Sequence, residues 1–128
     1  MHYLTVEQLI KVNEAILTRC GGGLIGIVNH KALKEVIEKP KLKIEDYEPF
    51  PTLWEKAAVL IDTIIKNKPF ANANTATAFI ACDLMLKLNG YKLIININDI
   101  DQILAISLYQ STLPQISSWI KEKSIVID

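Results

Sequence analysis

Residues 75–89 read Thr-Ala-Thr-Ala-Phe-Ile-Ala-Cys-Asp-Leu-Met-Leu-Lys-Leu-Asn, and Gly90 follows them. The first half of this segment is apolar on almost every side, which is typical of a helix surrounded by other helices. Phe79, Cys82 and Leu86 recur at i, i+3 and i+7, so they should form one stripe that faces the neighbouring helices. Glycine accepts the left-handed geometry in which many helices end, and Gly90 is the predicted stop. The segment predicts an all-α fold around a central buried helix.

Start and stop signals on the N-terminal side predict three further helices. A threonine followed three positions later by glutamine or glutamate can form a capping box, and asparagine is also a preferred N-cap. The predicted starts are Thr5 with Gln8, Asn29, and Thr52 with Glu55. The glycines at positions 21–23 should end the first helix, of about residues 6–19, and Lys68-Pro69 should end the third. The side chains expected to face the core are Val6, Leu9, Ile10, Ile16 and Leu17, then Ala32, Leu33, Val36 and Ile37, then Leu53, Ala57, Leu60, Ile61, Ile64 and Ile65.

Two more helices are predicted after Gly90. Asn98, with Asp99 and Asp101 in the first turn, should start one that carries Ile100, Ile103 and Leu104. Thr112 with Gln115 should start the last, which carries Leu113, Ile116, Trp119 and Ile120. Prolines 40, 49 and 51 bracket an irregular segment, Lys41 to Phe50, where alternating Leu42 and Ile44 allow a short strand-like flap. The expected architecture is a compact six-helix bundle.

Composition restricts the class of protein. The length of 128 residues suits one domain, residues 1–128, and 50% hydrophobic residues are enough for its core. Lys plus Arg and Asp plus Glu number 14 each, so the basic excess of a nucleic-acid binder is missing. The sequence shows no signal segment and no apolar run of the roughly 18 residues that span a membrane. With two cysteines, too few for a disulfide scaffold, we expect a cytoplasmic protein that binds neither nucleic acid nor membranes.

The stretch Lys68 to Ala78 is the candidate site. Small and polar residues here precede the most apolar helix, and a helix N-terminus offers free N–H groups and a dipole that favour an anion. The residues alone fit a plain helix–loop–helix connection better than a binding site.

A family resemblance changes this interpretation. Phe70, Ala73, Asn74, Thr77 and Ala78 match the loop His-x-Phe-x-Asp/Glu-Ala/Gly-Asn-Lys/Gly-Arg-Thr-Ala of the Doc (death-on-curing) branch of the Fic/Doc family. Further likeness runs along nearly the whole chain, at Tyr3-Leu4-Thr5, Leu24, Gly26, Ile27, Leu33, Pro40, Leu53, Lys56-Ala57-Ala58 and Leu88-Asn89-Gly90-Tyr91. The chain thus resembles Doc toxins, and the resemblance implies a Fic/Doc-like bundle.

The resemblance also implies a chemistry and a partner. Family members transfer AMP or phosphate from a nucleotide triphosphate to a hydroxyl of a target protein, and the Doc toxin phosphorylates elongation factor Tu. The histidine is the general base, the acidic residue helps to hold Mg²⁺, and the cationic pair holds the phosphates. In the Doc branch a small antitoxin binds as a helix in a groove of the toxin. We expect such a groove at exposed apolar residues of the first helix and of Lys41 to Phe50.

The sequence departs from the family at each of these catalytic positions. Lys68 stands at the histidine, and a solvated lysine is almost entirely protonated at neutral pH. Asn72 stands at the acidic residue and is a neutral, weaker ligand for Mg²⁺. Thr75 and Ala76 stand at the cationic pair, so both charges for the phosphates are lost. Phe70, Ala73, Asn74, Thr75 and Ala76 would be vestigial phosphate-loop positions, and His2 and His30 are predicted to be surface or capping residues.

Three hypotheses follow. The favoured one is a catalytically degenerate Doc-like protein that keeps the fold and binds antitoxin, target or nucleotide, with no metal site and no cofactor. The alternative is an active toxin of a toxin–antitoxin pair, which would use ATP, Mg²⁺ and Lys68 or a borrowed group. The third is an active sequence disarmed by engineering, because Asp to Asn and Arg to Ala are common knock-out changes.

Overall fold

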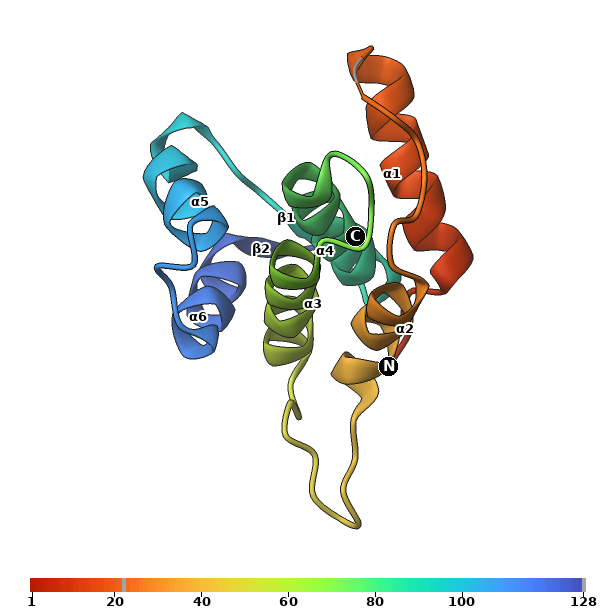
Figure 1. The fold of residues 1–128 in the computed structure, drawn as a ribbon. Helices are drawn as coiled ribbons and strands as arrows, with labels where there is room; N and C mark the ends of the chain where they lie inside the picture. The colour runs from red at the N-terminus through yellow and green to blue at the C-terminus, as the bar shows by residue number, and fades with distance from the viewer. Residues whose placement is uncertain (22, 128) are drawn as a thin grey trace.

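Helices α3 (Leu53–Asn67) and α4 (Asn74–Leu88) lie side by side in the middle of the molecule (Figure 1). The computed structural model describes residues 1–21 and 23–127, so Gly22 of the glycine run lies outside it. Helices α1 (Val6–Cys20) and α2 (His30–Glu38) flank the pair on one side, and α5 (Ile100–Ser107) and α6 (Leu113–Lys123) lie on the other. Short 3₁₀ turns cover Lys39–Lys41 and Ile97–Asp99. Six α-helices among the described residues confirm the predicted all-α bundle.

Most of the predicted helix starts are confirmed by their hydrogen bonds. Thr5 and Gln8 form a complete capping box, as do Thr112 and Gln115. The side chain of Asn29 accepts the N–H of Ala32 at 2.9 Å. At Thr52 only half of the box forms, because the Glu55 carboxylate accepts the Thr52 hydroxyl rather than its backbone N–H.

The predicted start of the fifth helix was wrong. Asn96, not Asn98, begins this segment: its side chain accepts the N–H of Asn98, and Asp99 accepts the N–H of Asn96, both at 2.9 Å. This closed turn makes residues 97–99 a 3₁₀ turn and delays α5 until Ile100. The helix then buries Ile106, while Ile100 and Leu104, expected to face the core, are about half exposed at 49% and 52%.

A small sheet was not predicted. Strand β1 (Tyr91–Leu93) pairs antiparallel with β2 (Ser124–Val126), with Tyr91 opposite Val126 and Leu93 opposite Ser124. Three residues are too few to show the alternation by which a strand is recognised in a sequence. The pairing ties the chain after α6 to the end of α4.

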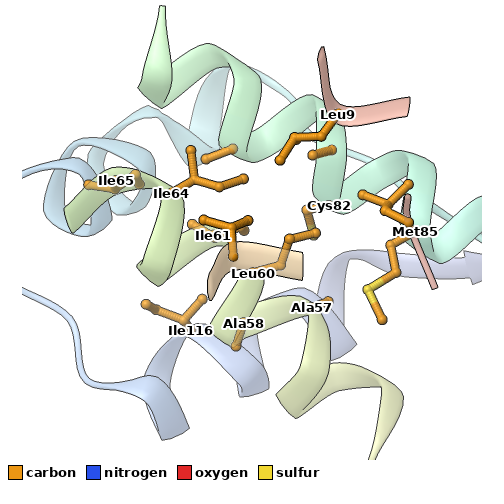
Figure 2. Close-up of a cluster of buried hydrophobic side chains, with 14 of the residues drawn as sticks. Leu9, Ala57, Ala58, Leu60, Ile61, Ile64, Ile65, Cys82, Met85 and Ile116 are labelled. Atoms are coloured by element: carbon orange, nitrogen blue, oxygen red, sulfur yellow. The ribbon is translucent and has the colours of Figure 1, made fainter. Parts of the chain in front are cut away.

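The core is built on both central helices (Figure 2). Helix α4 is central, as predicted, and Cys82 and Leu86 of its stripe are fully buried. Phe79, expected in the same stripe, is only partly buried, and its ring forms a T-shaped pair with that of Trp119, with centroids 6.1 Å apart. Helix α3 buries more side chains than α4 and packs against α2, α4 and α6. The two helices therefore share the central position.

The segment from Lys41 to Phe50 forms a protruding loop (Figure 1). Ile44 and Tyr47 exchange two backbone hydrogen bonds of 2.8 Å, which is a single bridge rather than a longer strand-like flap. None of the described helices is both long and apolar enough to cross a membrane.

Candidate functional site

The loop between α3 and α4 has an unusual backbone at both of its ends. Lys68 ends α3 with a left-handed φ of 47°, and its N–H reaches the carbonyl of Ile64 at 3.0 Å. Ala73 precedes α4 with a φ of 62°, and no side chain of the described residues caps it. Such a conformation is costly for residues other than glycine and persists where neighbouring contacts hold it. Within the described part of the chain, no side-chain cap therefore accepts the first-turn N–H groups of α4.

Phe70 and Asn74 hold the loop together from within. Phe70 is buried at 2% exposure. Its N–H donates to Asn74 Oδ1 at 3.0 Å, and its carbonyl accepts Asn74 Nδ2 at 2.9 Å. These two predicted phosphate-loop residues thus form a closed pair of hydrogen bonds that fixes the loop's shape.

The segment after α1 braces the loop from one side. The N–H of Ala71 donates to Gly26 at 3.0 Å, and Asn72 Nδ2 donates to the carbonyl of Leu24 at 3.2 Å. Gly23 has a φ of 88°, and a Cβ there would lie 2.7 Å from Asn72 Cγ. From the sequence, the glycine run was predicted to be a helix stop, and it was part of the family likeness together with Leu24 and Gly26. Its contact with a loop 48 residues away was not visible.

Asn13 of α1 braces the loop from the other side, and sequence reasoning missed it. Its side chain is 1% exposed, and Nδ2 donates to the backbone carbonyl of Asn72 at 2.9 Å and to Thr77 Oγ1 at 3.1 Å. A signal was present, because Asn13 interrupts the apolar stripe of Leu9 and Leu17 at i, i+4 and i+8. Ile16, expected in that stripe, instead lines a surface groove.

A cleft of about 560 Å³ opens in front of the loop. Of the predicted site residues, Lys68, Asn72, Ala73, Asn74, Thr75 and Ala76 line it, whereas Phe70 lies buried beneath. The end of α5 completes the cleft with Ser107, Leu108 and Tyr109, which the sequence did not single out. Tyr109 also has a left-handed φ of 61°, and its hydroxyl donates to the carbonyl of Ile65 at 3.2 Å. His2 and His30 do not line the cleft.

The residues of the cleft do not fit Mg²⁺. No carboxylate lies among the described residues that line it, and the amide of Asn72 donates to Leu24. Mg²⁺ in nucleotide sites is usually held by at least one carboxylate. Across residues 1–21 and 23–127, no group of three His, Cys, Asp or Glu side chains could hold a metal ion. An anion fits better, because Lys68 and the uncapped first turn of α4 border the same space.

A second concavity lies between α1 and α4. This groove, of about 540 Å³, is lined by Val12, Ala15 and Ile16 of α1 and by Ala76, Ile80 and Leu84 of α4. Gln8, Lys11, Arg19 and Cys20 border it. Ala76 lines both the groove and the cleft, so the two sites share a wall.

The fold and its loop define a helical protein with a cleft at a helix N-terminus. Residues 3–86 match the sequence model of the Fic/DOC family, so the chain belongs to this family. Its sequence is 28% identical over 72 residues to the protein named Toxin Doc of Mycolicibacterium smegmatis. That alignment covers 56% of this chain and 55% of the relative, so the chain matches about half the length of that protein. The family match ends before residues 88–91, where we expected further likeness.

Proposed function

We propose that this chain is a catalytically degenerate Doc-like protein that binds partners and does not transfer phosphate or AMP. The observation that carries the proposal is the side chain of Asn72. At the family's acidic position, its Nδ2 donates to Leu24 at 3.2 Å, and its backbone carbonyl accepts Asn13 at 2.9 Å. The residue thus serves the architecture of the loop, and the amide offers no negative charge for a metal ion.

The other replacements remove the remaining parts of the reaction. Lys68 lies exposed at the end of α3, and it stands where the family has the histidine that acts as general base. Thr75 and Ala76 bring no charge to the phosphates. Loss of a general base alone costs a factor of roughly 10²–10⁴ in rate. Losses within one site are not additive, but all of these act in the same direction.

A label-transfer assay tests the proposal. The protein is incubated with cell lysate, Mg²⁺ and ATP labelled at the α- or the γ-phosphate, so that AMP and phosphate transfer are read separately. We expect no labelled protein above a control without the chain. Robust labelling that disappears in Lys68→Ala would overturn the proposal. It would support the alternative, an active toxin acting on a hydroxyl of a target such as elongation factor Tu.

We also propose that the α1–α4 groove is the binding site of a small antitoxin, which would bind as an amphipathic helix in the cytoplasm. Its apolar lining on two neighbouring helices, with Lys11 and Arg19 at the border, suits such a helix. Part of the expected location, the exposed side of α1, supports this proposal, whereas Lys41 to Phe50 does not line the groove. A small reading frame beside the gene would be co-expressed with the chain. Ile16→Asp should abolish co-purification, and Ile125→Asp on exposed β2 should not.

A further inference from the structure

Asn13 connects the groove to the loop. On α1 it lies between Val12 and Ile16, which line the groove, while its own side chain is buried on the loop side. On α4 its partner Thr77 follows Ala76, which lines both the groove and the cleft. Neighbouring residues of the same two helices therefore face the groove on one side and hold the loop on the other.

A ligand in the groove would act directly on these hydrogen bonds. A molecule in the groove contacts Val12 and Ile16 of α1 and Ile80 of α4, and a shift of α1 relative to α4 changes the distance from Asn13 Nδ2 to the carbonyl of Asn72, in the loop that leads into α4. That distance is 2.9 Å, and hydrogen bonds weaken steeply as distance and angle depart from the preferred range. The bond is partly buried, so its loss leaves the Asn72 carbonyl with a desolvation cost unless another donor replaces Asn13.

We propose that Asn13 is a positioning residue that couples occupancy of the α1–α4 groove to the conformation of the loop from Lys68 to Asn74. The coupling deepens the proposed function, on which it rests, because it makes groove binding regulate the cleft. Coupling between two binding sites is reciprocal, so a ligand held in the cleft changes affinity at the groove by the same factor. A merely structural Asn13 would stabilise the loop equally whether the groove is filled or empty.

A natural cysteine at the groove allows the coupling to be tested by chemical labelling. Cys20 is exposed and borders the groove, while Cys82 is buried, and burial raises the pKa of its thiol. A pyrene maleimide therefore modifies Cys20 in the folded protein, places an apolar ring system at the groove and reports its burial by fluorescence. Hydrogen exchange of the peptide covering residues 66–78 reads the loop, where Phe70 and Ala71 donate to Asn74 and Gly26. This readout requires neither nucleotide nor activity.

We expect modification of Cys20 to change loop exchange by about fivefold or more, which is the lower end of typical coupling between sites. Asn13→Leu, which removes both bonds at similar volume, should abolish the response. Asn13→Asp should abolish it too, because a carboxylate can accept the Thr77 hydroxyl but cannot donate to the Asn72 carbonyl. Thr77→Val keeps the bond to Asn72 and should retain the response.

Two controls make the result decisive. In a Cys20→Ser, Lys34→Cys variant the same reagent is attached at an exposed position of α2 that does not line the groove, and loop exchange should stay unchanged. Unfolding midpoints confirm that each Asn13 variant is folded. An unchanged loop after modification of Cys20, or an equal response in the folded Asn13 variants, would overturn the proposal. Because label transfer is measured separately, an active enzyme would refute the proposed degeneracy without deciding the coupling.

Discussion

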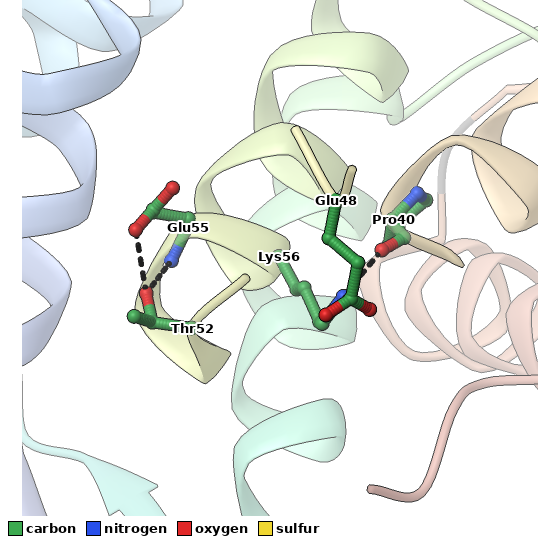
Figure 3. A network of polar contacts seen from close by, with 5 residues as sticks. All are labelled: Pro40, Glu48, Thr52, Glu55 and Lys56. Carbon is green, nitrogen blue, oxygen red and sulfur yellow. Dashed lines mark hydrogen bonds and ion pairs between the residues drawn. The ribbon is translucent and has the colours of Figure 1, made fainter. Parts of the chain in front are cut away.

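The ammonium group of Lys56 lies 2.9 Å from the backbone carbonyl of Pro40 and donates a hydrogen bond to it, although both residues are buried (Figure 3). The carboxylate of Glu48 is 3.8 Å from the same ammonium, and the ring of Tyr3 lies 5.6 Å from it. One side chain of α3 thus fastens both ends of the protruding loop. Burial of a lysine is tolerated only with such partners.

We predict that Lys56→Ala lowers the free energy of unfolding by about 2–5 kcal/mol, as for other truncations of long core side chains. Lys56→Met keeps the apolar stem and leaves the Pro40 carbonyl without its donor, which should cost about 1–3 kcal/mol. Glu48→Gln alters a partly exposed ion pair and should cost no more than about 1 kcal/mol. Urea unfolding of the three variants measures this order, and a larger loss in Glu48→Gln than in Lys56→Ala would contradict it.

Restoring the family residues tests the proposed catalytic degeneracy. The combination Lys68→His, Asn72→Asp, Thr75→Lys and Ala76→Arg should recover label transfer or toxicity, because base, metal ligand and phosphate clamp act as one unit. Single reversions should do little. Asn72→Asp alone removes the bond to Leu24 and should destabilise the protein by about 0.5–1.5 kcal/mol. A quadruple revertant that folds but neither labels proteins nor harms cells would show that residues outside the loop also lack what the activity requires.

Core truncations should follow burial in the structure rather than apolar pattern. Ile61 of α3 is fully buried, so Ile61→Ala should cost about 2–5 kcal/mol. Phe79 is only partly buried, so Phe79→Ala should lower the free energy of unfolding by less than the about 3–5 kcal/mol that truncation of a fully buried phenylalanine costs.

Substitutions of the exposed Lys68 should have small effects. Lys68→Ala should change the free energy of unfolding by no more than about 0.5 kcal/mol. The free energy of unfolding of Lys68→Gly should be about 1 kcal/mol higher than that of Lys68→Ala, because glycine adopts the left-handed backbone conformation without strain. Circular dichroism during urea unfolding ranks the four variants, and a neutral Ile61→Ala would contradict the central position of α3.

Stability should decrease at both ends of the pH range because of Asp99 and Lys123. The N–H of Asn96 and the Lys123 ammonium, 3.0 Å away, hold the pKa of Asp99 below its usual value. The Asp99 carboxylate in turn raises the pKa of Lys123. The contribution of Asp99 is therefore present above about pH 4 and is lost as the pH falls through its lowered folded-state pKa. That of Lys123 is present below about pH 10.4 and is lost as the pH rises through its raised folded-state pKa.

Unfolding midpoints measured across this pH range check the assignment. In Asp99→Asn the decrease of stability in acid should be smaller, because the variant has no carboxylate at this position to take up a proton on unfolding. Lys123→Met should flatten the decrease in alkali. Profiles identical to that of the unaltered chain would show that this ion pair does not control the pH dependence.

Local signals predicted the helices well where the cap and the apolar spacing agreed. The capping boxes at Thr5 and Thr112 and the cap at Asn29 were correct because such bonds depend on residues three positions apart. The loop Lys68 to Ala76 was identified from its family motif, and six of its predicted residues do line one cleft. At the start of α5 two asparagines lie within three positions, and the sequence pattern favoured Asn98, whereas Asn96 forms the cap.

The amino-acid sequence by itself determined the class of fold, the ends of most helices and the absence of the catalytic side-chain types from the loop. These properties depend on spacing along the chain and on residue identity alone. Only the tertiary structure decided that Asn72 bonds to Leu24, that Asn13 holds the loop from α1, and that Tyr109 closes the cleft. Each of these contacts joins residues tens of positions apart, and their distances are set by how α1, α3, α4 and α5 pack together. No periodicity or local propensity along the chain encodes such a distance.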